Sequence, residues 1–309
     1  MSTDTPGVLV VGSITVDVTA FARRLPAPGE TVLGDDLSLV LGGKGANQAV
    51  AAALAGADTM MAGAVGDDPF ADVALDALRG HGVDVSAVRR VAGPTGVAHI
   101  RVDAAGENDI VMVPLANATV GASDVDAAVR AAAGRARVLL LQLETPVEVA
   151  RHAARVGREA GLLVVLDPAP AVPDLDPALW ADVDVVTPNE TEARILTGLP
   201  VDSLDDARAA GRWFVERGAG CAVVTLGGRG VVVVTADDSL HVPARPVDVV
   251  DSTAAGDAFA GYLGAGLASG QDVPAALPRA AAAGTLTVTR RGASASLPAG
   301  VDVDRLARS

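Results

Sequence analysis

The segment Asp251–Phe259, which reads Asp-Ser-Thr-Ala-Ala-Gly-Asp-Ala-Phe, holds the residues best suited to chemistry. Small side chains leave the backbone N–H groups of Ala254, Ala255 and Gly256 uncovered where an apolar helical pattern begins. Such amides attract phosphate and stabilise negative charge that develops during a reaction. Asp257 beside them could take a proton from an attacking hydroxyl, so the segment favours phosphoryl transfer. An ordinary helix start with a solvated first-turn acid is the alternative.

A second segment points the same way. Lys44 is the one lysine among 24 cationic residues, and it lies within Gly42-Gly-Lys-Gly-Ala-Asn-Gln48. A compact ammonium in a glycine-lined turn suits a single phosphate oxygen better than the planar guanidinium of arginine does. The amides of Asn47 and Gln48 add polar groups nearby. The alternative is a glycine-rich turn whose lysine points into water.

Composition narrows the class of protein and of partner. The chain has 309 residues, of which 50% are hydrophobic, enough for a large α/β core. Its net charge of −14 repels nucleic acid and anionic membranes, so neither is an expected partner. Cys221 is the one cysteine, which excludes an internal disulfide, and we expect it to be buried. The sequence has no signal-peptide pattern and no membrane-spanning apolar run, so we expect a cytoplasmic protein.

Short β-branched runs alternate with alanine-rich helical stretches, which predicts an α/β fold with a mostly parallel sheet covered on both faces. We expect strands at 8–11, 60–65, 138–143, 162–166 and 183–186, helices near 45–55, 123–134 and 146–160, and a hairpin of 231–235 with 239–243. Regions 15–41 and 97–113 do not follow this alternation, and we expect each of them to be an insertion of antiparallel strands. We expect a single domain over 1–309 whose insertions form a lid over the carboxyl ends of the main strands, where ligands bind in such sheets.

Eleven motifs lie in order from about residue 8 to 298: Gly12-Ser-Ile, Pro28-Gly-Glu-Thr31, Gly42 to Ala49, Gly66-Asp-Asp68, Thr95-Gly-Val97, Gly106-Glu-Asn108, Gln142-Leu-Glu144, Asp167-Pro-Ala-Pro170, Thr187-Pro-Asn-Glu-Thr-Glu-Ala193, Thr225 to Gly230 and Asp251 to Phe259. Through these motifs the chain resembles the ribokinases within the PfkB-type carbohydrate kinases. The resemblance implies a ribokinase-like three-layer sandwich with a small antiparallel β lid. It also implies a small-molecule sugar and ATP as ligands.

The resemblance implies specific roles for residues of the sugar site. Asp257 would be the general base for the sugar's 5-hydroxyl, and the amides of Ala254, Ala255 and Gly256 would form the anion hole. Residues expected to contact the sugar, with Asp257, are Thr15, Asp17, Gly43, Lys44, Asn47 and Glu144. Read without the family, Asp17 would be a surface strand residue and Glu144 a helix-start cap ahead of Thr145-Pro146.

For the nucleotide, the resemblance implies Asn189 and Glu192 near Mg²⁺ and phosphate, and Thr225, Gly227, Gly230 and Gly256 along ATP. The alternatives are a reciprocal helix cap for the first pair, which is compatible with the Mg²⁺ role, and a tight turn between strands for the glycines. A monovalent activator, K⁺, is implied with the residues Asp251, Thr253, Thr287, Arg290, Gly292 and Ser296.

The expected reaction is ATP-dependent phosphorylation of D-ribose at O5. Thr15 departs from the family, because many ribokinases have an asparagine there, so 2-deoxyribose, another sugar or a nucleoside stays open as the acceptor. Two further alternatives are a sugar-binding regulator without catalysis and a dinucleotide-binding dehydrogenase. The dehydrogenase is disfavoured because Gly12 is not followed by the other glycines of that fingerprint. A homodimer through the lid sheet is expected.

Overall fold

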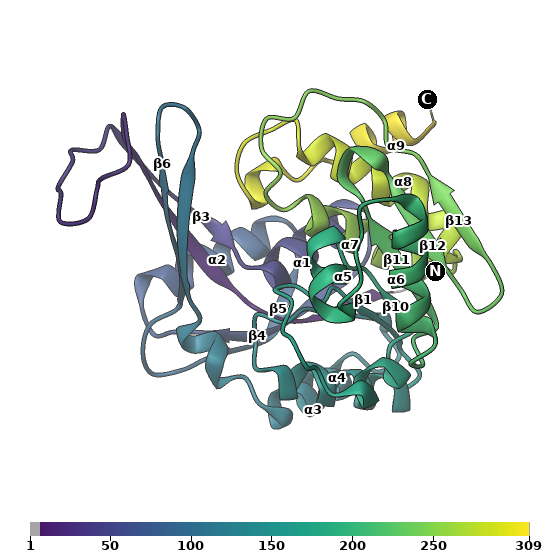
Figure 1. The fold of residues 1–309 in the computed structure, drawn as a ribbon. Coiled ribbons are helices and arrows are strands. Elements are labelled where there is room, and N and C mark those ends of the chain that lie inside the picture. The colour runs from purple at the N-terminus through teal and green to yellow at the C-terminus, as the bar shows by residue number, and fades with distance from the viewer. Residues whose placement is uncertain (1–6, 309) are drawn as a thin grey trace.

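The main body is a sheet covered on both faces by helices (Figure 1). The computed structural model describes residues 7–308. Within that range, nine strands form the main sheet in the order β13-β12-β11-β10-β9-β8-β1-β4-β5. Every pairing from β11 to β5 is parallel, and β12 and β13 run antiparallel at one edge. These strands are β1 (Gly7–Val11), β4 (Thr59–Val65), β5 (Asp84–Arg90), β8 (Ala136–Leu141), β9 (Leu163–Leu166), β10 (Val185–Val186), β11 (Cys221–Thr225), β12 (Val231–Val234) and β13 (Ser239–Val242).

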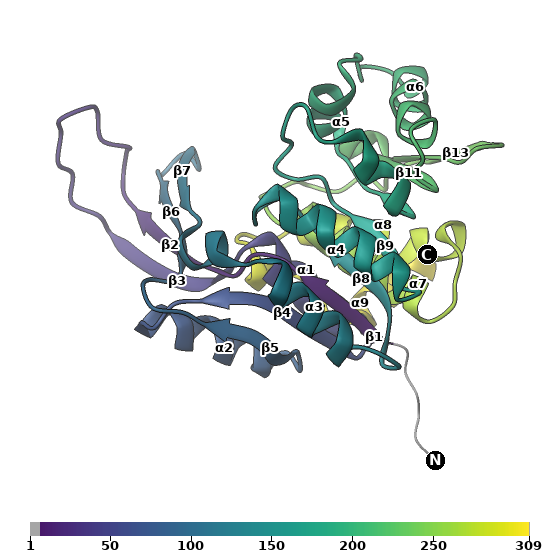
Figure 2. The same ribbon diagram turned by 90° about the horizontal axis from the view of Figure 1, so that it is seen from below.

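Two helical layers cover the sheet (Figures 1 and 2). One layer packs into the core that also contains Val10, Leu140 and Tyr262, and the other packs against the opposite face of the same strands. The first layer contains α1 (Lys44–Leu54), α2 (Pro69–Gly80), α7 (Ala255–Ala268), α8 (Val273–Thr287) and α9 (Gly300–Arg308). The second contains α3 (Ala122–Ala131), α4 (Val147–Glu159), α5 (Glu190–Thr197) and α6 (Leu204–Val215). This is the three-layer sandwich that the sequence predicts.

Strands with continuous apolar runs are buried on both sides, as the alternation of strands and helices requires. The strand expected at 138–143 begins at Ala136 and ends at Leu141, which leaves Gln142 just beyond its carboxyl end. No residue of the edge strand β5 is buried, and Ser86, Arg89 and Arg90 are exposed, so its polar composition gives no clear strand pattern in the sequence. Cys221 is buried, as expected, and burial raises the pKa of its thiol to about 11.

The two insertions form a separate sheet that projects from the body (Figure 2). In the described part of the chain this sheet has the order β3-β2-β6-β7, from β2 (Thr15–Phe21), β3 (Asp36–Gly42), β6 (Gly96–Val102) and β7 (Asn108–Val113). Each insertion is an antiparallel pair, and β2 and β6 join the pairs through a parallel register. Because β2 begins shortly after the carboxyl end of β1, the lid starts at the carboxyl ends of the main-sheet strands, where ligands are expected.

Helix α7 is the central helix of its layer. Its residues from Asp257 to Ala268 are all buried, against α1, α8 and β8. The helix is rich in alanine and glycine, so neighbouring backbones approach closely. Within residues 7–308, no helix is both long and apolar enough to cross a membrane.

Candidate active site

Asp257 lies in the first turn of α7, and its side chain is buried. Ala254 is the N-cap residue of this helix and has the left-handed conformation, with φ of 60°. Its side chain makes no capping hydrogen bond to the helix start. The Ala255 N–H donates to the Ser252 carbonyl over 3.3 Å. A side chain built on Gly256 would meet no described atom within 4 Å, so open space lies beside the helix start. The start of α7 therefore has room for an anion next to a buried carboxylate.

Two amides from α1 hold the Asp257 carboxylate. Asn47 Nδ2 donates to Oδ2 over 3.0 Å, and Gln48 Nε2 donates to Oδ1 over 3.2 Å. The other end of the Asn47 amide, Oδ1, is buried and has no hydrogen-bond partner in the described part of the protein. Because a buried acceptor without a partner is costly, this oxygen suits a hydroxyl supplied by a ligand.

Thr15 and Asp17 of the lid lie on one face of β2, since side chains alternate along a strand. Both are buried, so Asp17 is not the surface residue that a reading without the family would suggest. Burial raises the pKa of Asp17 to about 6, with smaller upward contributions from Glu144 and Asp257 and an opposing one from the Thr15 hydroxyl, which donates to its Oδ1 over 3.3 Å. A Cβ on Gly42 would lie 1.9 Å from that oxygen, so the glycine makes room for this carboxylate.

Glu144 is a helix cap, but not of the helix that follows it. Pro146 occupies the cap position of α4, and its side chain makes no capping hydrogen bond. Glu144 Oε2 instead accepts from the Lys44 N–H at the start of α1, over 2.9 Å, and from the Ser13 hydroxyl over 2.6 Å. Gly43, with φ of 89°, precedes α1, and a Cβ there would lie 2.9 Å from the Thr15 nitrogen. The start of α1 is thus joined to the beginning of the lid.

The Lys44 ammonium lies between two buried carboxylates rather than in water. Its Nζ is 3.7 Å from Asp167 Oδ2 and 3.9 Å from Asp257 Oδ1. Burial by itself lowers the pKa of Lys44, but these carboxylates raise it by more, so the net shift is upward. Burial raises the pKa of Asp167, and Lys44 offsets part of that rise. The lysine is therefore charged and partly neutralised before any anion arrives.

Asn189 and Glu192 form the reciprocal cap at the start of α5 that their spacing suggests. Asn189 Oδ1 accepts from the Glu192 N–H over 2.9 Å, and Glu192 Oε2 accepts from the Asn189 N–H over 2.8 Å. Burial raises the pKa of Glu192, and these N–H groups offset part of that rise. Thr225 pairs with Asn189 in an isolated parallel bridge, so the end of β11 lies beside this helix start.

Gly227 and Gly230 bound a tight turn between β11 and β12. Both have positive φ, of 50° and 94°, and a Cβ on Gly230 would lie 2.0 Å from the Val242 carbonyl oxygen. Arg229 in this turn reaches Glu190 of α5 and the Val201 carbonyl, the latter over 3.2 Å. One side chain therefore ties the turn to the helix start that carries Asn189.

Three of the six residues expected near a monovalent cation meet at Asp251. Its Oδ1 accepts from the Thr253 N–H and hydroxyl, over 2.9 and 2.7 Å, and its Oδ2 accepts from the Gly292 N–H over 2.9 Å. Burial alone would raise the pKa of Asp251, but these hydrogen bonds lower it overall. Thr287 and Ser296 lie on either side of Gly292 in the sequence, and both are buried. Each donates a hydrogen bond from its hydroxyl to a backbone carbonyl. The Arg290 side chain instead points to Asp302, 3.9 Å away.

The residues expected around the monovalent cation include one carboxylate, that of Asp251. Within residues 7–308, no three histidine, cysteine or acidic side chains gather in a way that could hold a metal ion. One carboxylate with hydroxyl and carbonyl oxygens suits a large, weakly hydrated cation better than a divalent one. These residues are of a type that the expected activator would accept, and the Asn189–Glu192 pair offers oxygens for hydrated Mg²⁺, but both cation sites stay predictions.

Comparison with known proteins identifies the family. The profile of the pfkB family carbohydrate kinases matches residues 5–300. The chain belongs to the pfkB family of carbohydrate kinases. A deoxyribokinase from Salmonella typhi is 38% identical over 292 residues, covering 94% of this chain and 95% of that protein. A ribokinase from Haemophilus influenzae is 36% identical over 290 residues, covering 94% of each. The structure of Arabidopsis thaliana ribokinase complexed with ribose and ATP superposes with a TM-score of 0.90 at 31% identity, covering 99% of each chain.

Sequence reasoning assigned no role to four polar residues that this pfkB-family protein places around Lys44 and Asp257. Ser13 bridges Glu144 and the Gly45 N–H, and Gln48 bridges Asp167 and Asp257. The four residues are Ser13, Gln48, Gln142 and Asp167. All of them lie inside the motifs that carry the family resemblance, and Gln48 lies one helical turn after Lys44, which is the signal that could have identified it.

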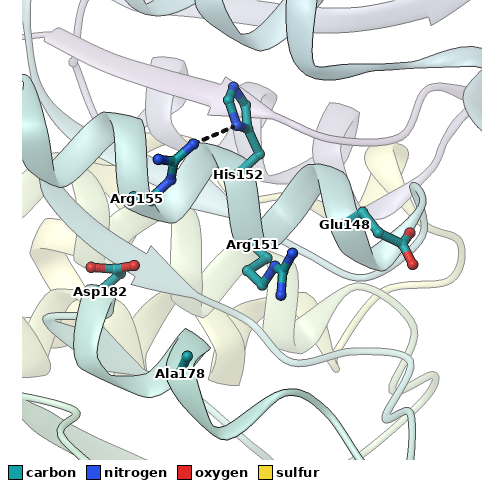
Figure 3. Close-up of a pocket in the computed structure, with 6 residues that line it drawn as sticks. All are labelled: Glu148, Arg151, His152, Arg155, Ala178 and Asp182. Carbon is teal, nitrogen blue, oxygen red and sulfur yellow. Dashed lines mark hydrogen bonds between the residues drawn. The ribbon is translucent and has the colours of Figure 1, made fainter.

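A separate pocket of about 280 Å³ lies between α4 and the short 3₁₀ helix Pro177–Asp182 (Figure 3). It belongs to the helical layer opposite α7, so it is distinct from the site around Asp257. His152 in its lining is engaged with two neighbours, since its Nε2 donates to Asp126 Oδ1 over 2.7 Å and its Nδ1 accepts from Arg155 over 3.3 Å. The lining residues are Glu148, Arg151, His152, Arg155, Ala178 and Asp182.

Proposed function

We propose that this carbohydrate kinase transfers the terminal phosphoryl group of ATP to O5 of D-ribose, which yields D-ribose 5-phosphate and ADP. The observation that carries the proposal is the buried Asp257 carboxylate, held by Asn47 and Gln48 beside the open start of α7. The ribokinase from Haemophilus influenzae and the ribose and ATP in the Arabidopsis thaliana structure support this choice of acceptor and donor.

In the proposed reaction Asp257 accepts the proton of the sugar's 5-hydroxyl as O5 attacks the γ-phosphorus. The bond from that phosphorus to the bridging oxygen of ADP breaks, and the electron pair leaves with ADP. The N–H groups of Ala254 and Gly256 then stabilise the charge that develops on the transferred group, and the Ala255 N–H joins them when it leaves the Ser252 carbonyl. The lid strands β2, β3, β6 and β7 close over the sugar and exclude water, which would otherwise hydrolyse ATP.

The sugar would be read hydroxyl by hydroxyl. Asp17 and Glu144 accept hydrogen bonds from hydroxyls, the unpartnered Oδ1 of Asn47 accepts another, and the backbone of Gly43 lies within the same region. Lys44 binds the phosphoryl group that is being transferred. A buried network of this kind discriminates strongly, because a missing hydroxyl leaves one of its members without a partner.

The nucleotide would extend from Gly256 toward the turn of Gly227 and Gly230, with Thr225 alongside. Asn189 and Glu192 would hold Mg²⁺ through water, which neutralises phosphate charge. Two segments would hold K⁺ through hydroxyl and backbone oxygens, one with Asp251 and Thr253 and the other with Thr287, Arg290, Gly292 and Ser296. When bound, both cations would supply electrostatic stabilisation to a site in a strongly acidic protein.

2-Deoxyribose is a second candidate acceptor. The relative from Salmonella typhi is a deoxyribokinase, and Thr15 is shorter than the asparagine of many ribokinases and lacks its amide. The Thr15 hydroxyl already donates to Asp17, over 3.3 Å. A site without that amide would lose little when the sugar lacks a hydroxyl, so it would tolerate the deoxy sugar.

A homodimer through the lid completes the proposal. Large apolar side chains of the lid are exposed, on β3 and β7, which are the edge strands of its sheet. They are Leu37, Leu39, Ile110, Val111 and Val113. A second copy of the lid would cover this apolar surface and the strand edges.

The deciding experiment compares Asp257→Asn with the parent protein in a coupled ADP assay, with ribose, 2-deoxyribose, fructose and adenosine as acceptors, with and without K⁺. The variant should lose nearly all turnover, by a factor of about 10² to 10⁴, while ribose binding measured by calorimetry persists. Asp205→Asn, on an exposed side chain, is the matched control and should keep full turnover. Normal turnover by Asp257→Asn would contradict the base assignment, and ribose binding without ADP release by the parent protein would indicate a regulator.

A further inference from the structure

The proposed base and Asp167 share one lysine and one amide. Asp167 follows β9, Asp257 belongs to α7, and both carboxylates are buried. Gln48 Nε2 donates to Asp167 Oδ2 over 2.8 Å and to Asp257 Oδ1 over 3.2 Å. Lys44 approaches the same two oxygens, at 3.7 and 3.9 Å. The two acids thus form one cluster with a single cation.

The amide that links these acids is fixed in its orientation. Gln48 Oε1 accepts from Gln142 Nε2 over 2.6 Å, so Gln48 has only its Nε2 end available for the acids. This chain of contacts connects the carboxyl end of β8 to α1 and then to α7.

No step of the proposed reaction uses Asp167, although a buried carboxylate lowers stability unless it is paired. Burial raises its pKa, Lys44 lowers it, and the acids Glu192, Asp257 and Glu144 raise it further. The remaining function of its charge is to attract Lys44. Without Asp167, Asp257 would be the one described acid within 4 Å of the ammonium, and Lys44 would pair with it more closely, while Glu144 and Glu192 act from farther away.

We propose that Asp167 is a positioning residue that divides Lys44 between two acids and so keeps the Asp257 oxygens available for the sugar proton. The same division leaves the ammonium placed to meet the incoming phosphoryl group. This inference rests on the proposed function, because it takes Asp257 as the base. It concerns the rate of the chemical step and not sugar affinity, since Asp167 makes no contact with the groups proposed to bind the sugar other than through Lys44 and Gln48.

The test combines kinetics with a measurement that needs no turnover. Asp167→Asn keeps an acceptor for Gln48 and removes the charge, and it should lower kcat by about 10- to 100-fold with the KM for the sugar unchanged. In a Lys44→Met background the same substitution should have no further effect, because Asp167 acts through that lysine. Asp205→Asn is again the control for an exposed Asp-to-Asn change.

The single lysine makes the second measurement direct. With ¹⁵N-labelled lysine the protein gives one side-chain Nζ signal, and its chemical shift at neutral pH should change in Asp167→Asn because the ammonium loses one of its two carboxylate partners. Effects on kcat that multiply in the double variant, or an unchanged Nζ chemical shift, would overturn the proposal. Should Asp167→Asn not fold, Gln48→Met removes the shared amide, and an undiminished kcat there would overturn it too. Failure of the proposed function shows separately, as turnover by Asp257→Asn.

Discussion

Gly261 on α7 lies directly against Ala51 on α1: a Cβ on Gly261 would stand 2.5 Å from the Ala51 Cβ and 2.7 Å from the Gln48 carbonyl oxygen. Gly261 is one turn after Asp257, and Ala51 is one turn after Asn47. The close approach of the two helices at this point therefore places the α1 amides within hydrogen-bond distance of the proposed base.

Gly261→Ala should separate α1 from α7 and weaken the contacts to Asp257. We expect a loss of about 1–3 kcal/mol in the free energy of unfolding, because the added methyl meets backbone atoms, together with a lower kcat. Gly80→Ala at the end of α2 is the control, since a Cβ there meets no described atom within 4 Å. Denaturant unfolding and steady-state kinetics measure both effects, and equal stability of the two variants would show that helix spacing does not depend on Gly261.

Asp17→Asn should raise the free energy of unfolding above pH 6. The pKa of Asp17 in the folded protein is about 6, above its ordinary value of 3.8, so its stability contribution is complete below pH 3.8 and is lost as pH rises through about 6. Asparagine does not titrate, so the variant should gain on the order of 3 kcal/mol relative to the parent protein above pH 6, and little at pH 4. Unfolding measured at both pH values tests this, and a gain independent of pH would contradict it.

The same Asp17→Asn variant should lose sugar affinity, because the amide keeps one acceptor oxygen and replaces the other with an NH2 donor. Calorimetry with ribose is the measurement. Unchanged affinity would remove Asp17 from the proposed sugar site while leaving the stability prediction intact.

Thr15→Asn should raise the ratio of kcat/KM for ribose over that for 2-deoxyribose. The amide can bond the additional hydroxyl, and a hydrogen bond of about 1 kcal/mol corresponds to a change of roughly fivefold. Thr15→Val, which keeps the shape and loses the hydroxyl, separates this effect from the contact with Asp17. A ratio that does not differ among the three proteins would mean that another residue selects the sugar.

Arg229→Met should raise the KM for ATP by roughly threefold to tenfold while the KM for the sugar stays constant, since it releases the turn of Gly227 and Gly230 from α5. Initial rates at varied ATP concentration provide the measurement. Arg217→Met is the control, because that arginine contacts Trp213 on α6 and not the turn. A change in the sugar KM alone would place Arg229 in another role.

The layered architecture and the local motifs could be predicted from the sequence alone. Apolar runs such as Leu163–Leu166 are long enough and apolar enough to require cover on both faces, so the parallel sheet could be predicted. The start of α7 could be predicted from small residues before an apolar helix. The helix cap formed by Asn189 and Glu192 follows from their spacing, since a reciprocal cap is a local interaction.

Contacts between distant segments could not be predicted in this way. Glu144 caps α1, 100 residues earlier in the chain, and not the helix that follows it, and Gln48 reaches Asp257 across 209 residues. Nothing in the local pattern around Asp167 indicates that it competes with Asp257 for Lys44. Such pairings depend on how the helices pack, which glycines such as Gly261 control through the distance between backbones. Residue types and local spacing therefore determined the helices and strands and the kind of chemistry. Tertiary packing decided which carboxylates contact Lys44 and which amides hold Asp257.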